Sequence, residues 1–292
     1  MTDPIASDEP VTGRCQAIVG PWTHGEHVNE ATLQAIRLEW FETWLKDAPT
    51  GKADTSTPLH LFENGASGWV DSAARPLSSD ARTYYLGDGS LTTDKPADRG
   101  SDTLTWSTAT AANTLTCTTA PLTEPALLDG PTDVTLYARS TTPETELSAE
   151  LSIVAPDGTV TKQADGILLG SQRALDTKES WYGENGTLLK PIHPFTQASQ
   201  RPVPPGETTR YDISLLSNFT RIPAGCHIRI SIDSRPPADF HFPVAPTPQG
   251  SADLAGGVHT VERSAQAASF VNLPLTAPSS ATPSREDRGP SS

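Results

Sequence analysis

The sequence predicts a mostly β protein, in which a β-sandwich or jelly roll follows a short segment of strand and helix. Three observations favour this fold class. The 292 residues include 27 prolines and 21 glycines, which favour short strands and frequent turns. Many short runs with strand character are separated by Gly, Pro and Asp. One stretch shows the spacing of an amphipathic helix, and the length suits one large or two ordinary domains.

The first elements lie near the N-terminus. Residues 1–14 are polar and acidic, so we expect a disordered start, without the basic and apolar regions of a signal peptide. The apolar run Cys15–Val19 is typical of a strand buried on both faces in a parallel sheet. From Asn29, which can cap a helix, apolar residues recur at helical spacing until about Asp47. We expect this apolar stripe to be core; it comprises Leu33, Ile36, Trp40, Phe41, Trp44 and Leu45.

From Pro58 onward the pattern changes to short alternating runs, each with one face suited to a core. Pro156-Asp157-Gly158 is strong turn chemistry, so we expect the chain to reverse there. Residues 171–207 predict a Pro-rich loop packed on the sandwich, and residues 276–292 a disordered tail. The expected strands are Leu59–Phe62, Thr83–Leu86, Leu104–Trp106, Leu115–Thr118, Val134–Ala138, Leu147–Val154, Thr209–Leu215, His227–Asp233, Val258–Val261 and Phe270–Leu273.

Charge and cysteine usage exclude several classes of function. The chain has 21 Lys and Arg against 35 Asp and Glu, a net charge of −14. This balance argues against nucleic acid and against an anionic membrane surface as partners. Cys15, Cys117 and Cys226 are too widely spaced for a disulfide framework or a zinc site, so we expect buried thiols. No apolar run approaches the length of a membrane span, and we expect a cytoplasmic protein.

His24 is the candidate catalytic residue. It follows the Cys15–Val19 run and the Gly20-Pro21 stop, and an amphipathic helix comes next. In α/β enzymes, catalytic groups usually lie just past the C-terminal end of a buried strand. A histidine in such a loop can act as general base for a nucleophilic serine. The alternative interpretation is a satisfied structural or surface histidine, and the spacing of His24, Glu26 and His27 does not favour a metal.

The partners that His24 would need are missing from the expected places. In α/β-hydrolases the chain order is Ser, then Asp or Glu, then His, so both partners should precede His24. Only Ser7, Asp3 and Asp8 are available there, in polar sequence without a pattern. Elsewhere, the segment nearest to a nucleophile elbow is Gly65-Ala66-Ser67-Gly68-Trp69, which we interpret as a turn.

The order of several motifs resembles a known family. Gly20-Pro21-Trp22-Thr23-His24-Gly25 and the helix residues Glu39–Lys46 look like the catalytic-histidine segment of X-Pro dipeptidyl-peptidases and cocaine-esterase-type serine hydrolases. The resemblance covers roughly residues 15–275. It continues through Leu61–Gly65, Gly68-Trp69, Tyr84–Leu91, Pro121–Pro125, Leu128–Pro131, Ala155–Gly158, Asp165-Gly166, Gly225–Ile232 and Asn272–Pro274.

The resemblance implies a division of the chain into four parts. Residues 1–14 would be a disordered start, and residues 15–57 the last strand, His loop and helix of a truncated α/β-hydrolase domain. Residues 58–275 would form a C-terminal jelly-roll β-sandwich of the galactose-binding-like type, and residues 276–292 a disordered tail.

The resemblance also implies hydrolysis of peptide or ester bonds by a Ser-Asp-His triad, with no cofactor and no metal. Only His24 carries over, as general base, because the family's serine and aspartate match nothing in this sequence. We therefore expect a chain that is inactive alone. Its partners would be a peptide or ester substrate in the complete enzyme and a separate catalytic half.

Two alternatives from other classes stay open. The strand-rich region could be a stand-alone module that binds carbohydrate or a protein, with Trp69, Trp106 and Trp181 as candidate contacts, although each is more simply explained by packing. The chain could also be a remnant without function. In that case the Cys15–Val19 strand and the Trp40/Trp44 face would lack neighbours and solubility would be poor.

Overall fold

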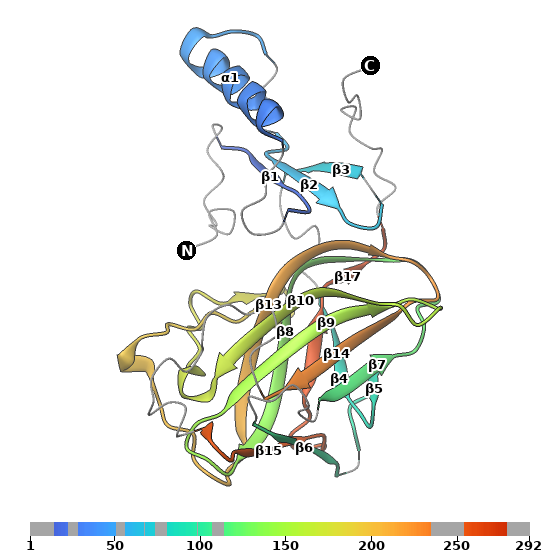
Figure 1. Cartoon of the computed structure of the whole chain (residues 1–292), viewed down its shortest axis with the longest axis vertical. Helices are drawn as coiled ribbons and strands as arrows, with labels where there is room; N and C mark the ends of the chain where they lie inside the picture. The colour runs from blue at the N-terminus through green and yellow to red at the C-terminus, as the bar shows by residue number, and fades with distance from the viewer. Residues whose placement is uncertain are drawn as a thin grey trace. The chain divides into compact units, whose positions relative to one another are not determined.

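The computed structural model describes residues 15–22, 29–50, 56–66, 68–73, 81–97, 99–106, 114–234 and 254–278 (Figure 1). The protein is mostly β, as predicted, and the described residues contain one α-helix. The chain divides into two compact units. The smaller unit comprises Met1–Leu77, Phe219–Arg221 and Pro278–Ser292, and the larger unit comprises Ser78–Asn218 and Ile222–Ala277.

The smaller unit contains a three-stranded sheet in the order β1-β2-β3. Strand β1 (Ala17–Val19) pairs in parallel with β2 (Leu59–Glu63), which pairs antiparallel with β3 (Gly68–Ser72). The parallel pairing of the first strand agrees with the sequence prediction, but its expected burial is wrong. Ile18 and Val19 are 38% and 40% exposed, because β1 pairs only with β2 among the described residues.

Helix α1 (Glu30–Lys46) has the predicted boundaries. The Asn29 side chain accepts a hydrogen bond from the Thr32 backbone N–H at 3.0 Å, and the left-handed Asp47 ends the helix. The expectation that its apolar stripe is core is wrong: none of the six residues is buried, four of them are half-buried, and Thr43 is the one buried residue of the helix. Phe41 and Leu45 are 56% and 76% exposed, because no described element of this unit covers that face of the helix.

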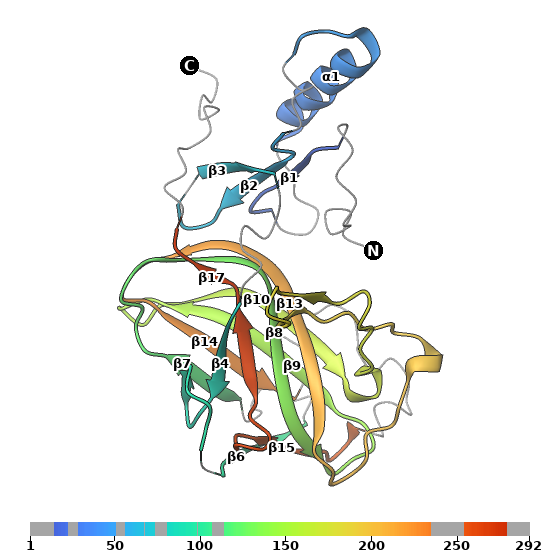
Figure 2. The same ribbon diagram turned by 180° about the vertical axis from the view of Figure 1, so that it is seen from behind.

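The larger unit is built on one twelve-stranded sheet that folds into two layers. Strands β9, β10 and β14 form the layer nearer the viewer in Figure 1, and β8, β13 and β16 form the layer nearer the viewer in Figure 2. The order is β10-β9-β14-β7-β5-β4-β16-β8-β15-β6, with β13 and β17 also on β8. Their bounds are β4 (Arg82–Leu86), β5 (Ser90–Thr92), β6 (Ser101–Thr105), β7 (Leu115–Thr119), β8 (Ala126–Ser140), β9 (Glu146–Val154), β10 (Val160–Leu169), β13 (Thr209–Ile222), β14 (His227–Asp233), β15 (Val258–Glu262), β16 (Phe270–Leu273) and β17 (Leu275–Thr276).

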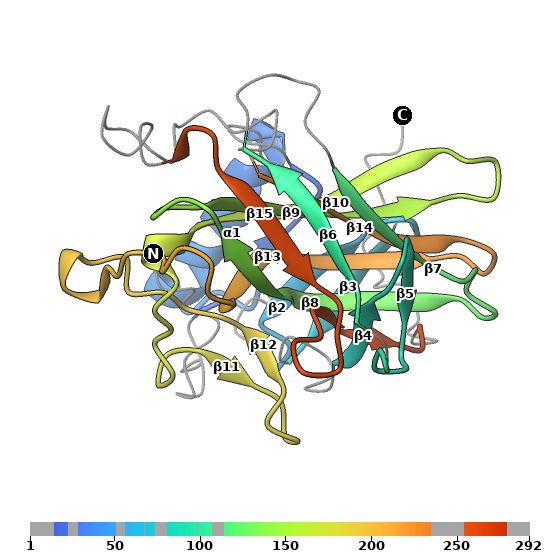
Figure 3. The same ribbon diagram turned by 90° about the horizontal axis from the view of Figure 1, so that it is seen from below.

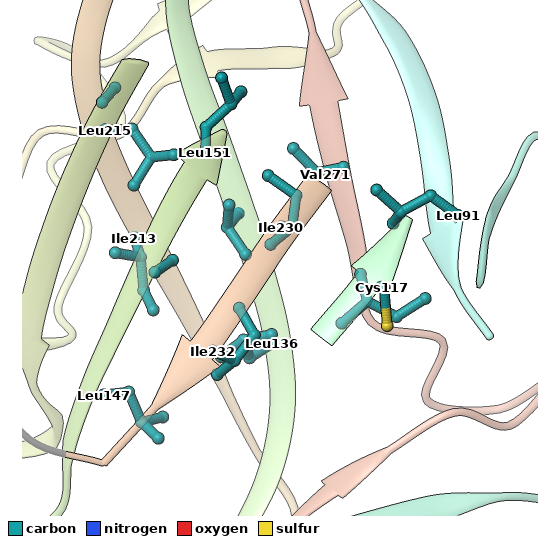
Figure 4. Packing of buried hydrophobic residues seen from close by; sticks show 14 of the residues in the cluster. Leu91, Cys117, Leu136, Leu147, Leu151, Ile213, Leu215, Ile230, Ile232 and Val271 are labelled. Atoms are coloured by element: carbon teal, nitrogen blue, oxygen red, sulfur yellow. The ribbon is translucent and has the colours of Figure 1, made fainter. Parts of the chain in front are cut away.

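The core lies between these two layers (Figure 4). Ile228, Ile230 and Ile232 of β14 are fully buried on one face, as their alternation predicts. They pack in one cluster with residues such as Leu136 of β8 and Leu151 of β9. Because both layers contribute a buried face, the larger unit covers its own apolar residues.

Each strand predicted in the larger unit forms, although β8 and β13 are much longer than the sequence indicated. The short strands β3, β5 and β17 were missed, as was β10, which pairs with β9 through the predicted Pro156–Gly158 turn. The predicted 171–207 loop also contains some regular structure. It holds two single-turn helices, η1 (Gly170–Gln172) and η2 (Gln197–Ser199), and a ribbon of β11 (Trp181–Tyr182) with β12 (Leu188–Lys190), seen in Figure 3.

Candidate functional site

The candidate general base, His24, lies outside the described residues, as do Glu26 and His27. The structure describes the flanks of the loop that carries it. Strand β1 ends at Val19, directly before Gly20 and Pro21, and helix α1 begins at Glu30. The predicted order of strand, loop and helix therefore holds around residues 23–28, and the geometry of His24 itself stays a prediction.

An aromatic cluster follows the Gly20-Pro21 stop. The ring of Trp22 lies 6.0 Å from that of Trp69 on β3, and Trp69 meets Phe62 of β2 edge-on at 5.4 Å. Phe62 and Trp69 are also direct cross-strand partners. Aromatic pairs of this kind stabilise a sheet beyond simple burial, so the cluster holds the start of the His24 loop against the β2–β3 hairpin.

The hairpin turn itself requires a glycine. Gly65 has φ +84°, and a Cβ at this position would lie 2.7 Å from the Arg221 carbonyl oxygen. Buried Glu63, just before the turn, forms an ion pair with the Arg221 guanidinium at 2.5 Å. Gly65 and Ala66 thus form the turn that the sequence predicts, whereas Ser67 lies outside the described residues.

His60 and Asp71 form a pair that the sequence reasoning did not identify. They are cross-strand partners on β2 and β3, with His60 Nδ1 2.6 Å from Asp71 Oδ1. The other ring nitrogen lies 3.4 Å from Gln16 Oε1. A carboxylate that orients an imidazole is one half of acid–base chemistry. Here the second nitrogen faces an amide and not a hydroxyl or thiol, so the pair has the geometry of a structural contact.

The remaining candidates have packing roles in the structure. Trp106 donates its indole N–H to Glu146 Oε2 at 2.8 Å, and the Lys190 ammonium lies 4.4 Å above the Trp181 ring. Cys117 and Cys226 are buried, as expected, but Cys15 is exposed because β1 begins only at Ala17. Within the described residues, no three of His, Cys, Asp and Glu gather as metal ligands.

The larger unit contains a buried polar network that the sequence did not predict. The Thr135 hydroxyl lies 3.0 Å from Asp133 Oδ2 and 2.8 Å from Asp212 Oδ1. One hydroxyl has one hydrogen to donate, so it cannot satisfy two ionised carboxylates. Burial, and next the charge of Asp212, raise the pKa of Asp133 well above its usual range. Asp133 is therefore the protonated partner, and Asp212 is the carboxylate that binds Arg210.

Most of the chain matches the model of a known protein family. Residues 51–272 match the family described as the X-Pro dipeptidyl-peptidase C-terminal non-catalytic domain. This match covers most of the chain, which belongs to that family and so to the X-Pro dipeptidyl-peptidase and cocaine-esterase type that the motifs resemble. No curated protein matches the chain.

Three solved structures share the fold. A CocE/NonD family hydrolase from Staphylococcus aureus superposes with a TM-score of 0.70 at 14% identity, over 85% of this chain and 46% of that protein. An aminopeptidase from a marine sediment Thaumarchaeota archaeon gives 0.67 at 18% identity, over 90% and 49%. An alpha-amino acid ester hydrolase gives 0.59 at 19% identity, over 82% and 44%. The chain thus spans about half the length of these structures.

Two of the polar clusters, His60 with Asp71 and Asp133 with Asp212, could be identified only once the pairing of the strands was known. His60 and Asp71 are eleven residues apart, and they meet because β2 and β3 pair. Asp133 and Asp212 lie on β8 and β13, far apart in sequence. No pattern within either strand singles these aspartates out, because each strand carries further charged residues, such as Asp129 in β8 and Arg210 in β13. Finally, no helix among the described residues is long and apolar enough to cross a membrane.

Proposed function

We propose that this chain is the C-terminal part of a serine hydrolase that removes X-Pro dipeptides from peptide N-termini or hydrolyses esters. The observation that carries the proposal is the family match over residues 51–272. It is supported by a fold shared with a CocE/NonD hydrolase, an aminopeptidase and an ester hydrolase, each about twice as long as this chain.

In this proposal, residues 15–57 are the last strand, His loop and helix of an α/β-hydrolase domain. The exposed apolar residues of the smaller unit support this assignment. Ile18 and Val19 on β1, and Phe41 and Leu45 on α1, are the surfaces that further strands and helices of a hydrolase domain would bury. Residues 58–275 are proposed as the galactose-binding-like jelly roll, although β2 and β3 of this range pair with β1 in the smaller unit. The predicted tail from residue 276 is wrong at its start, because Thr276 pairs with Leu127 in β17, and residues 1–14 and 279–292 lie outside the described residues.

His24 is the proposed general base. Its imidazole would take the proton from a serine hydroxyl as the serine attacks the carbonyl carbon, and later return it to the leaving group. The serine, the triad acid and the oxyanion donors are proposed to come from a separate catalytic portion, because the 292 residues contain no Gly-x-Ser-x-Gly elbow. The chain alone is then inactive, requires no cofactor, and is cytoplasmic in this proposal.

The first test uses the purified chain alone. We expect no labelling by a serine-directed fluorophosphonate probe and no turnover of an X-Pro chromogenic substrate. Robust turnover that is lost in Ser67→Ala would overturn both the proposed inactivity and the interpretation of Ser67 as a turn residue.

The second test supplies the serine and the acid of the proposed triad from a separate polypeptide. The chain is co-expressed with a separate α/β-hydrolase portion that carries the serine and the acid, and turnover of X-Pro and ester substrates is measured. We expect turnover that His24→Gln lowers by at least about a thousandfold, as for loss of a triad base. His60→Gln is the matched control and should retain activity. Equal loss in the two variants would argue against His24 as the base.

Binding of carbohydrate or protein by the larger unit is the alternative, and it stays a prediction. Its test is a glycan array, on which saturable binding that weakens in Trp181→Ala would favour it. The partial burial of Trp106 and Trp181, and the contacts described for them, favour packing.

A further inference from the structure

The larger unit has a surface pocket with an unusual charge. Its volume is about 340 Å³, and its lining consists of Arg173, Ala174, Leu175, Arg201, Arg210 and Asp212. Three arginines therefore face one aspartate, in a chain whose net charge is −14. A concentration of one sign of charge in a concave site raises the local concentration of ligands of the opposite sign.

Arg173 is held in place by neutral acceptors. Its Nη1 donates to the carbonyl oxygens of Gly170 at 2.8 Å and Arg201 at 2.7 Å, and its Nη2 donates to Pro202 at 3.2 Å. These bonds fix the guanidinium and leave two of its five N–H groups for a ligand. They do not neutralise its charge. Within the described part of the chain, neither Arg173 nor Arg201 takes part in an ion pair.

Arg210 differs, because Asp212 holds it. Its Nε lies 2.8 and 3.1 Å from the two oxygens of Asp212, and its Nη2 lies 2.8 Å from Oδ1. Asp212 is only 5% exposed and also accepts from the Thr135 hydroxyl. The aspartate is thus committed to Arg210 and Thr135, and the positive charge of Arg173 and Arg201 stays available.

His193 fixes the wall behind the pocket. This buried side chain has Nδ1 3.0 Å from the Ala174 carbonyl oxygen and Nε2 2.8 Å from that of Asp212. It therefore ties together two lining residues that come from different segments of the chain.

We propose that this pocket binds a small organic carboxylate with an apolar side group, which Arg173 and Arg201 hold through its two oxygens. A guanidinium fork matches the two oxygens of a carboxylate. Ala174 and Leu175 provide the apolar wall for the side group. The Asp212 carboxylate in the lining disfavours a doubly charged phosphate more than a singly charged carboxylate. The site involves neither His24 nor hydrolysis, so it stands apart from the proposed function.

The test is calorimetric titration of the full chain with N-acetyl-leucine, its neutral amide and inorganic phosphate. We expect saturable binding of N-acetyl-leucine, with no binding of the amide and weaker binding of phosphate. Arg201→Gln should weaken the affinity at least about tenfold, because a hydrogen bond between charged groups is lost. Arg201 is exposed and has no ion pair among the described residues, so the variant should fold. Arg201→Lys keeps the positive charge but loses the planar guanidinium. Its affinity for N-acetyl-leucine should therefore lie between those of the unmodified chain and of Arg201→Gln.

A matched control removes the same charge elsewhere in the same unit. Arg139 pairs with Glu262 at 2.8 Å and does not line the pocket. Arg139→Gln should leave the affinity within about twofold, since Arg139 is half exposed, where salt screens its charge, and does not contact the pocket. The proposal is wrong if the amide binds as well as the acid, if phosphate binds more tightly, or if Arg201→Gln and Arg139→Gln have equal effects. Absence of binding at about 10 mM ligand would also overturn it.

Discussion

The two units of this chain use the same kinds of apolar residue in opposite ways. In the larger unit, Leu136 and Ile230 are completely buried between two layers of one sheet. In the smaller unit, Phe41 and Leu45 of helix α1 are more than half exposed. The larger unit therefore covers its own core, whereas the smaller unit presents apolar surface that a further structure would have to cover.

The difference follows from the number of neighbours that each strand has. Strand β8 pairs with β15, β16, β13 and β17, and most of its residues are buried. Strand β1 pairs with β2 and, within the described residues, with no other strand. A strand with one neighbour and no covering layer leaves its side chains in water, whatever their hydropathy. The apolar pattern of a strand or helix therefore indicates which face should be buried. Whether that face is buried depends on the strands and layers that the rest of the fold places against it.

The largest effect should come from a cavity in the larger unit. Ile230→Ala should lower the free energy of unfolding by about 2–5 kcal/mol, because it removes a fully buried side chain from a packed core. Leu38→Ala on α1 is the matched variant, and its effect should stay within about 0.5 kcal/mol because Leu38 is 58% exposed. Urea denaturation followed by circular dichroism gives both values. Equal effects would remove the contrast between the units.

Acid should destabilise the larger unit through His259. Burial lowers the pKa of this histidine to about 4, whereas in the unfolded chain it titrates near its ordinary value of 6.5. Below about pH 6.5, His259 therefore binds a proton in the unfolded chain, whereas in the folded chain it stays neutral until the pH approaches 4. The stability is fully present above that pH and should fall by about 3 kcal/mol as the pH drops to about 4.

The readout is the free energy of unfolding at several values of pH. His259→Asn removes the titrating group, so this part of the pH dependence should disappear, even if the variant is less stable at neutral pH. Leu38→Ala in the smaller unit serves as the control: it removes no titrating group and should leave the slope unchanged. An unaltered slope in His259→Asn would contradict the assignment.

A smaller effect is expected at the start of helix α1. Asn29→Ala removes the side chain that accepts the Thr32 N–H at 3.0 Å, which should cost about 1 kcal/mol of helix stability. Hydrogen exchange of the α1 amides should accelerate about fivefold. In the larger unit, Asn185→Ala removes a comparable side-chain acceptor, that of the Thr187 N–H in the β11–β12 turn, and should leave α1 exchange unchanged. Faster exchange throughout both units would instead show that they unfold together.

The smallest change in stability is expected on the exposed face of α1. Leu45→Glu replaces a side chain that is 76% exposed, so the free energy of unfolding should change by less than about 0.5 kcal/mol. Any self-association that the chain shows in sedimentation should be weaker in this variant, because an apolar surface is lost. A large loss of stability would mean that Leu45 is covered in solution.

Much of the fold could be predicted from the chain. The strand Leu147–Val154, the alternation in Ile228–Ile232 and the Pro156–Gly158 turn rest on local chemistry and are confirmed. The one-sided burial expected for Leu147–Val154 is wrong, because Ser148 and Ser152 on its polar face are buried as well. The boundaries of α1 follow equally from Asn29 and Asp47. Strands such as β10 were missed because Gly166 and polar residues interrupt its pattern. The glycine is there because a Cβ would lie 2.1 Å from the Ser214 carbonyl oxygen of β13, a contact that only the folded chain has.

The sequence by itself determined the family, the mostly β class and the place of His24 between a strand and a helix. These depend on motifs and periodicities that are contiguous along the chain. Only the tertiary structure decided that Ile18, Phe41 and Leu45 are exposed, and that Asp133, Asp212 and the arginine pocket come together. Burial and polar contacts depend on which strands pair and in what register, and residues such as Thr135 and Asp212, 77 positions apart, meet only through that pairing.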